Sequence, residues 1–195
     1  MPKFREDGTD KQKVVKLIEL QYFERSDFSQ LVAWVTSPEF LLQWGGPDFE
    51  YPLDDKQLDH YISGANRPGS TVLIFRGMDS ASGHVVGHIS LGRIDRKNQS
   101  GRIGKVLVGD PGMRGQGIGQ SMIRQLLAIA FDDLQLHRIS LGVFDFNHTA
   151  IEAYRKVGFT LEGVLRDARK IGNEFWNLCE MGMLAHEWRT RKTAT

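Results

Sequence analysis

Two periods of apolar residues alternate along the chain, and the first third is mainly helical. The segment from Val14 to Gln21 carries β-branched and apolar residues without helical spacing, which predicts a first strand. Apolar positions at helical spacing follow Ser26, a suitable N-cap, and Asp54 or Asp55 could cap a later helix. The predicted elements are a strand at 14–21 and helices at about 26–36, 39–44 and 54–65.

From residue 71 the period changes to two, which is the period of β-strands. Three strands are predicted at 71–75, 85–92 and 102–108. The segments between them, Met78-Asp79-Ser80 and 95–101, have the composition of turns. Because the connections are short, an antiparallel meander is the natural arrangement.

The clearest helix of the chain is predicted at 118–134. Apolar residues recur every four positions from Ile118 to Leu134, and Ile123 and Leu127 widen the stripe. Later elements are a strand at 138–146, a helix near 150–157 that ends at Gly158-Phe159, and strands at 161–170 and 174–183 joined around Gly172-Asn173.

This order of strands and helices predicts an α/β fold. We expect one domain with a mixed, mostly antiparallel central sheet of about seven strands, flanked by about four helices. The domain is expected at 13–188, between an N-terminal extension at 1–12 and a C-terminal tail at 189–195.

Composition narrows the class of protein. The chain has 195 residues, 41% hydrophobic and 25% charged, as expected for a globular domain with a sizeable core. A net charge of +1 gives no strong field toward nucleic acid or an acidic membrane. One cysteine, Cys179, excludes an intrachain disulfide, and the polar N-terminus is unlike a signal peptide. We therefore expect a soluble cytoplasmic protein without nucleic-acid or membrane partners.

A glycine-rich loop joins the third strand of the meander to the long helix. The segment Asp110 to Gly119 holds Arg114 and four glycines, of which Gly115, Gly117 and Gly119 stand at every second position. Glycines let backbone N–H groups approach a ligand, and the helix start attracts phosphate. The alternative is a structural turn. Neither a Walker loop nor a Rossmann fingerprint fits, because the residues that follow are Ile118, Gln120 and Met122.

This loop resembles the signature of the GNAT superfamily of N-acetyltransferases, Gln/Arg-x-x-Gly-x-Gly/Ala, through Arg114, Gly117 and Gly119. A second segment with Asn147, Ala150, Tyr154 and Gly158-Phe159 resembles the family's later strand-to-helix unit. The resemblance implies a single-domain GNAT fold over nearly the whole chain. Trp44, Met181-Gly182-Met183-Leu184 and Glu187-Trp188 resemble the branch that acetylates ribosomal-protein N-termini, and its relatives acting on small amines.

The resemblance implies that an amine attacks the thioester of acetyl-coenzyme A (acetyl-CoA) directly. A main-chain N–H near Val108 could stabilise the oxyanion, and Tyr154 is the candidate general acid. The alternatives are a core role for Tyr154 and a helix cap for Asn147, and both roles of Asn147 can hold together. The expected cofactor-binding residues are Val106, Leu107, Val108, Arg114, Gly115, Gln116, Gly117, Ile118, Gly119, Gln120 and Asn147.

No general base is assigned from the sequence. The strand before the loop, 102–106, contains no acidic residue. Glu162, Glu174 and Glu180 on the closing strands could face the cleft, although exposed carboxylates are more common, and a water chain would serve equally.

Other polar signals are weaker. His84 and His88 would lie roughly 13 Å apart on a strand, so no metal site is expected. Cys179 is expected to be a buried strand residue, and Trp44 is the candidate for acceptor recognition. Arg155 and Lys156 could contact the 3′-phosphate of CoA or form a solvated helix face.

The sequence thus predicts an N-acetyltransferase that uses acetyl-CoA and no metal. The alternatives are a catalytically idle acyl-CoA-binding regulatory module and a nucleotide-binding α/β protein. The acceptor would be a small amine or a protein N-terminus, and sheet edges of this fold would support a homodimer. Acceptor identity, the base, acyl-chain preference and oligomeric state stay open.

Overall fold

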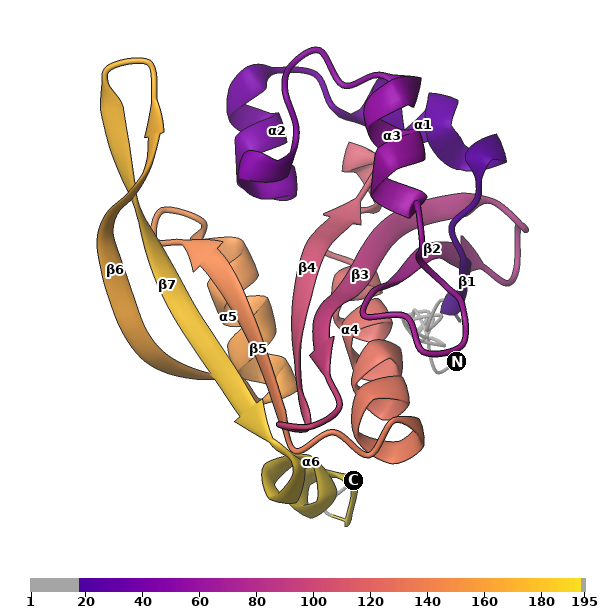
Figure 1. Cartoon of the computed structure of the whole chain (residues 1–195), viewed down its shortest axis with the longest axis vertical. Helices are drawn as coiled ribbons and strands as arrows, with labels where there is room; N and C mark the ends of the chain where they lie inside the picture. The colour runs from indigo at the N-terminus through magenta and orange to yellow at the C-terminus, as the bar shows by residue number, and fades with distance from the viewer. Residues whose placement is uncertain (1–17, 194–195) are drawn as a thin grey trace, which may run out of the picture.

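The computed structural model describes residues 18–193, which form one seven-stranded sheet with six α-helices (Figure 1). This confirms the predicted α/β class and strand number, with six helices where about four were expected. The strands are β1 Ile18–Tyr22, β2 Leu73–Asp79, β3 Val85–Asp95, β4 Ser100–Val108, β5 Arg138–Phe144, β6 Thr160–Ile171 and β7 Glu174–Leu184. The helices are α1 Phe28–Trp34, α2 Pro38–Gly45, α3 Asp55–Ile62, α4 Ile118–Ala128, α5 His148–Val157 and α6 Ala185–Thr193.

The sheet has the strand order β1-β2-β3-β4-β5-β7-β6, and only β4 and β5 are parallel neighbours. These two strands pair from Ser100 and Arg138 up to Ile103 and Leu141. β4 then continues to Val108 and β5 to Phe144 without further pairing, and Figure 1 shows them diverging. Beyond Ile103 and Leu141 the backbones of the two strands do not pair with each other, and a V-shaped opening separates them.

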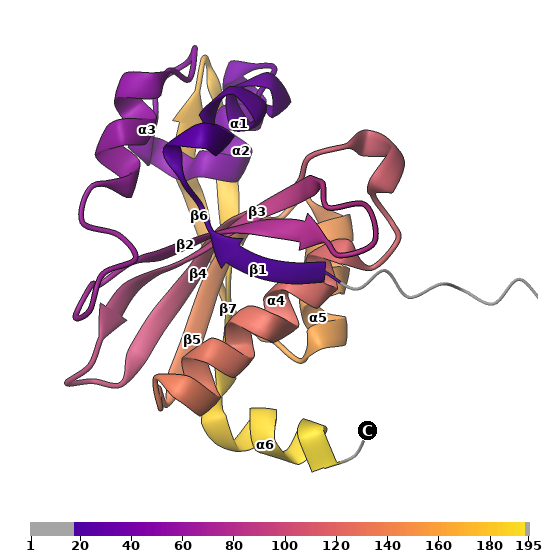
Figure 2. The ribbon, with the colours of Figure 1, turned by 90° about the vertical axis from the view of Figure 1, so that its right-hand side faces the viewer.

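Helices cover the sheet from both sides (Figure 2). α4 packs on β1, β3, β4 and α5, and its fully buried Met122 and Leu126 belong to the main core. α1 to α3 lie on the opposite side and enclose a second core that contains Phe28, Leu41 and Leu58. The two cores are separated by the sheet, so the opening between β4 and β5 connects two differently built sides.

Local capping explains where several helices begin. Ser37 caps α2 by accepting a hydrogen bond from the Phe40 N–H, and Asp54 caps α3 as expected. Ser26 was expected to cap the first helix, and this was wrong. Glu24 and Asp27 form a capping box around a 3₁₀ turn at Arg25–Asp27, so that α1 begins only at Phe28.

Some element boundaries also differ from expectation. β2 runs through Asp79, where a turn was expected, because Asp79 pairs with Ile18 of β1 and its N–H donates to the His84 carbonyl oxygen. The turn follows at once, and the buried Asp79 carboxylate holds it by accepting hydrogen bonds from the Ala81 N–H and the Ser82 hydroxyl. The long helix ends at Ala128 and continues as a π-helical turn at Ile129–Asp133. Helix α6 was not expected, and it runs past residue 188, the proposed end of the domain. The domain boundaries remain a prediction, and residues 14–17 of the first strand lie outside the described residues.

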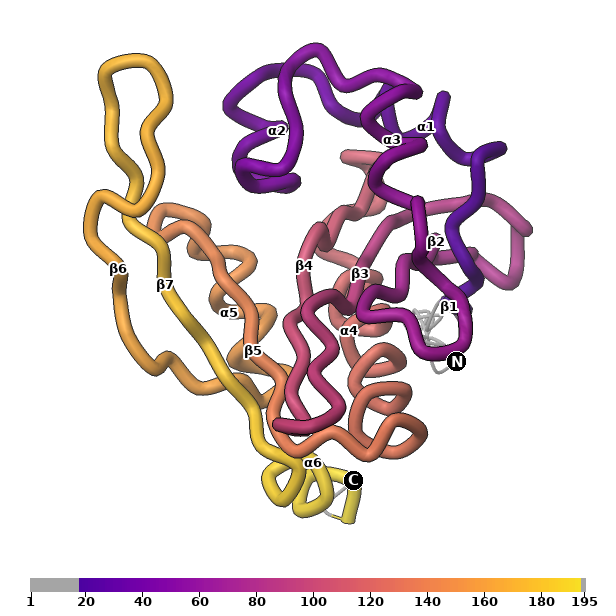
Figure 3. Tube along the Cα trace, viewed as in Figure 1, coloured from indigo at the N-terminus to yellow at the C-terminus, as the bar shows by residue number. Residues whose placement is uncertain are grey.

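The C-terminal half follows the expected pattern closely. α5 ends at Gly158, which has φ +124°, and Phe159 is buried behind it. β6 and β7 form a long hairpin whose turn at Gly172 has φ +54°, and the tube in Figure 3 shows its tip projecting beyond β5. Within residues 18–193, no helix combines the length and apolar character needed to cross a bilayer.

Candidate active site

A groove of about 570 Å³ runs between β4, the glycine loop, α4 and α5. Tyr154 and all but one of the expected cofactor-binding residues line it, the exception being Gln116. Its walls are Phe40, Gln43, Val106, Leu107, Val108, Met113, Arg114, Gly115, Gly117, Ile118, Gly119, Gln120, Ile123, Asn147, Thr149, Ala150, Glu152, Ala153, Tyr154 and Lys156.

The glycine loop forms one end of this groove. Gly115 and Gly117 have φ +75° and +83°, values that L side chains rarely adopt. Gly117 is the N-cap of α4, and no side chain caps this helix start. The first N–H groups of α4 therefore remain available to an anion, and the helix dipole favours negative charge there.

Arg114 lies at the mouth of the groove. It is exposed, and its Nε donates a 3.2 Å hydrogen bond to the Val108 carbonyl oxygen, which ties the guanidinium to the end of β4. Gln116 instead donates from Nε2 to the Gly112 carbonyl oxygen within the loop. Its side chain thus stabilises the loop and is absent from the groove wall, so a direct contact with a cofactor stays a prediction.

Tyr154 lies where the groove meets a second, smaller cavity. Its side chain is 8% exposed and packs edge-to-face on Phe159. Among the described residues its hydroxyl has no hydrogen-bond partner. Burial disfavours the phenolate and raises the pKa of Tyr154 to about 12. Tyr154 is therefore a neutral phenol at neutral pH, which can donate a proton but is a poor base.

Asn147 performs the capping role. Its Oδ1 accepts a hydrogen bond from the Ala150 N–H at 3.2 Å at the start of α5. The residue also lines the groove, so capping aims it toward any ligand there.

The second cavity, of about 100 Å³, lies between the diverging strands and α2. It shares seven wall residues with the groove, so the two spaces are continuous. Its walls are Phe40, Gln43, Trp44, Ile103, Gly104, Lys105, Val106, Leu107, Gly142, Val143, Phe144, Asn147, Ala150 and Tyr154.

Helix α2 forms one wall of this cavity. Trp44 was singled out in the sequence, but Phe40 and Gln43 were missed. The signal was available: the three residues stand at positions i, i+3 and i+4 and so share one helix face.

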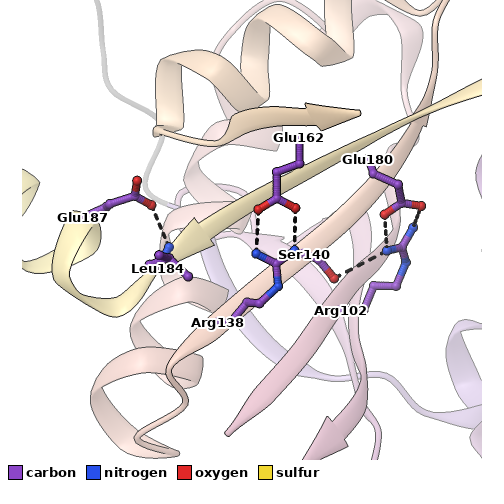
Figure 4. A network of polar contacts seen from close by, with 7 residues as sticks. All are labelled: Arg102, Arg138, Ser140, Glu162, Glu180, Leu184 and Glu187. Carbon is purple, nitrogen blue, oxygen red and sulfur yellow. Dashed lines mark hydrogen bonds and ion pairs between the residues drawn. The ribbon is translucent and has the colours of Figure 1, made fainter. Parts of the chain in front are cut away.

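None of the candidate bases is a wall residue of either cavity, and two of them are paired with arginines (Figure 4). Glu180 accepts two hydrogen bonds from the Arg102 guanidinium, at 2.6 and 2.8 Å, and Glu162 is paired in the same way with Arg138. Arg138 holds the pKa of the Glu162 carboxyl below its usual range. Glu174 is exposed near the hairpin turn. Among the described residues, the wall of the smaller cavity contains no carboxylate, and the groove has only Glu152, which pairs with Arg155.

Two other residues considered from the sequence, His88 and Cys179, are buried and line neither cavity. His88 is buried beside Tyr61, with 3.1 Å between Nε2 and the phenol oxygen, and burial lowers the pKa of His88 to about 3. Cys179 is a buried β7 residue, as expected, and burial raises the pKa of its thiol. Within residues 18–193 there is no group of three or more His, Cys, Asp or Glu side chains arranged to hold a metal ion.

Solved structures and curated sequences resemble this chain. The fold matches the spermidine N-acetyltransferase from Vibrio cholerae, solved with CoA and spermine, at a TM-score of 0.75, with 21% identity over 88% of this chain and 98% of that one. The chain is 28% identical over 110 residues to the "Putative ribosomal N-acetyltransferase YdaF" of Bacillus subtilis (strain 168), covering 56% of this chain and 59% of the relative. It is 24% identical over 153 residues, or 76% of each chain, to aminoglycoside N(6')-acetyltransferase type 1 of Klebsiella pneumoniae.

These relatives do not single out the ribosomal-protein branch, and the chain spans less than two thirds of the length of YdaF. The family itself is unambiguous. The model of the acetyltransferase (GNAT) family matches residues 32–159, which is more than half of the 195 residues and includes both sequence segments of the resemblance. The chain belongs to the acetyltransferase (GNAT) family.

Proposed function

We propose that this protein transfers an acetyl group from acetyl-CoA to a primary amine. The observation that carries the proposal is the continuous path from the open start of α4 along β4 to Tyr154 and the smaller cavity. The pyrophosphate of CoA would lie on the N–H groups at Gly117 to Gln120, beside Arg114. The pantetheine arm would follow Val106 to Val108 to the junction of the two cavities.

At that junction, the chain supplies orientation and one proton. The amine nitrogen forms a bond to the acetyl carbon while the bond from carbon to sulfur breaks. A β4 N–H freed by the divergence from β5 would stabilise the negative carbonyl oxygen. Tyr154, protonated at neutral pH, would give its proton to the departing sulfur, and the ammonium proton would pass to water.

The missing carboxylate favours one class of acceptor. At pH 7 an α-amine, with a pKa of about 7.7–8.0, is roughly one-tenth neutral, whereas only roughly one in 2,500 lysine-like amines is neutral at a pKa of about 10.4. A cavity without an acidic wall residue suits the amine that needs least help in losing its proton. We therefore propose a peptide or protein N-terminus as the acceptor, as the ribosomal-protein branch would require.

A panel of amines tests this acceptor class. Release of free CoA thiol would be followed with a short peptide, the same peptide acetylated at its N-terminus but carrying a lysine, and spermidine. Turnover should be fastest with the free N-terminus and at least roughly tenfold slower with the other two, given their scarcer neutral amine. Faster turnover with spermidine or with the blocked peptide would contradict the α-amine assignment, without contradicting acetyl transfer.

A second candidate is an acyl-CoA-binding module without turnover, which the absence of an acidic wall residue also favours. It predicts tight binding of acetyl-CoA and no thiol release with any amine in the panel. Retention of a buried Tyr154 at the junction argues for the enzyme.

We also retain the homodimer as a proposal. β6 is an edge strand, and large apolar side chains are exposed along it and beside it. These are Phe146, Leu161, Val164, Leu165 and Phe175. A molar mass of one chain in light scattering at micromolar concentration would refute it.

A further inference from the structure

At the edge of the smaller cavity, β4 has one extra residue relative to its neighbour β3. His88 pairs with Leu107 and Ser90 with Gly104, so a single residue on β3, Ile89, faces two on β4, Lys105 and Val106. This is a β-bulge, which bends the strand and turns its backbone. The bulge lies where β4 leaves β5, immediately before the segment proposed to contact the thioester.

The bulge is strained, because Lys105 has φ +53°, in the left-handed region that non-glycine residues rarely occupy. Such a conformation persists only where neighbours hold it in place. Two side-chain donors bind consecutive carbonyl oxygens of the bulge. The Trp44 indole Nε1–H donates to the Lys105 oxygen at 2.9 Å, and the Ser90 hydroxyl donates to the Gly104 oxygen at 3.1 Å.

The Lys105 side chain is held as well. Its ammonium lies 2.8 Å from the Asp48 carboxylate and over the rings of Phe49 and Tyr61, at 5.3 and 5.2 Å. Only 13% of this side chain is exposed. Contacts from α2, from the turn after it and from α3 therefore converge on one strained residue.

We propose that Trp44 and Ser90 are positioning residues for acetyl transfer. Their hydrogen bonds to the Lys105 and Gly104 carbonyls set the orientation of the following peptide groups, whose N–H would polarise the acetyl carbonyl. Trp44 also lines the smaller cavity, so it links the acceptor wall to the donor strand. This inference rests on the proposed acetyl transfer and assigns residues to it.

The indole N–H can be separated from the packing of the ring. Trp44 is buried, stacks on Phe49 with centroids 5.7 Å apart, and meets His88 edge-on. Phenylalanine would keep an aromatic ring at this place and remove the donor together with part of the indole, so a control must lose the same atoms from an equally buried site. Trp188 provides a matched control, because it is equally buried and its Nε1 donates to Asp132 at the far end of the molecule.

The experiment compares Trp44→Phe, Ser90→Ala and Trp188→Phe with the wild type. The infrared carbonyl stretch of bound [1-13C]acetyl-CoA reports polarisation of the thioester, and isothermal titration with CoA, which has no acetyl group, reports binding. In Trp44→Phe and Ser90→Ala the band should move toward that of free acetyl-CoA, and kcat should fall by roughly tenfold to a hundredfold. CoA affinity should stay within about twofold, and Trp188→Phe should match the wild type.

Each result tests either the positioning role or the proposed acetyl transfer. If either Trp44→Phe or Ser90→Ala keeps the wild-type band and kcat, the inference is wrong for that residue. If Trp44→Phe does not fold, Ser90→Ala still tests the bulge, since it removes one hydroxyl. A wild type that binds CoA and releases no thiol with any amine would refute the proposed function instead, and the carbonyl band would still test the positioning.

Discussion

At the scale of single residues, Tyr154 is a buried side chain that also borders both cavities. It lines both cavities, its hydroxyl has no partner among the described residues, and its pKa is raised to about 12 by burial. A tyrosine at helical spacing is usually a core residue, and Tyr154 is indeed in the core. The same burial keeps the phenol protonated, so the core role and the acid role are compatible.

Tyr154→Phe should lower kcat by roughly a hundredfold or more, since general acid catalysis is worth at least that much. CoA affinity should hardly change, and Tyr22→Phe, which removes a phenol hydroxyl on β1, is the control. Burial disfavours the phenolate and raises the pKa of Tyr154 to about 12, so Tyr154 stays mainly protonated at neutral and moderately alkaline pH. Wild-type kcat/KM should therefore rise as the α-amine deprotonates near pH 7.7–8.0 and show no fall up to about pH 10. A descending limb below pH 9, or full activity in Tyr154→Phe, would exclude this role.

At the scale of elements, α2 is the part that brings the acceptor wall to the sheet. Its start is fixed by Ser37, and its inner face carries Phe40, Gln43 and Trp44. The helix has only eight residues, so the capping hydrogen bond is a large fraction of the interactions that stabilise it.

Ser37→Ala should lower the free energy of unfolding by about 1 kcal/mol, measured by urea denaturation. It should also raise the KM for the amine severalfold and weaken CoA binding less, because the groove is lined mainly by β4, the glycine loop, α4 and α5. Asp54→Ala is the matched control, because Asp54 caps α3 and α3 lines neither cavity. Equal effects of both variants on the amine KM would show that α2 has no special part in acceptor binding.

Elements with strong periodicity could be predicted from the sequence, and those set by tertiary contacts could not. The strands and the Gly158 ending are local, and each was expected, while the Asn147 cap was considered as the alternative to cofactor binding. Glu24 and Asp27 displaced Ser26 as the cap by a reciprocal pair of hydrogen bonds, which residue type alone does not reveal. The same holds for the site. Gln116 lies inside the motif at a position that any residue can occupy, and its side chain folds back onto Gly112, while the bulge at Lys105 depends on contacts from distant segments.

At the scale of the whole molecule, the divergence of β4 from β5 creates the opening at which the two cavities meet. In the proposed function, the glycine loop and α4 on one side of the sheet would hold the donor, and α2 on the other side would contact the acceptor (Figure 2). Because the two cavities share walls, two substrates could meet within the opening without a covalent enzyme intermediate. The parallel pair with its crossover helix was foreseeable from the order of elements, but the point of divergence was not.

The central claim is that the main-chain N–H groups at the start of α4 hold the CoA pyrophosphate. Isothermal titration of CoA into Gly117→Asp tests it most directly, with Gly69→Asp as the control, since Gly69 has a similar φ of +80° in an equally open loop away from both cavities. We predict that Gly117→Asp weakens CoA binding on the order of a hundredfold, through backbone strain and repulsion between carboxylate and phosphate, and that Gly69→Asp binds like the wild type. Unchanged CoA affinity in a folded Gly117→Asp variant would contradict the account.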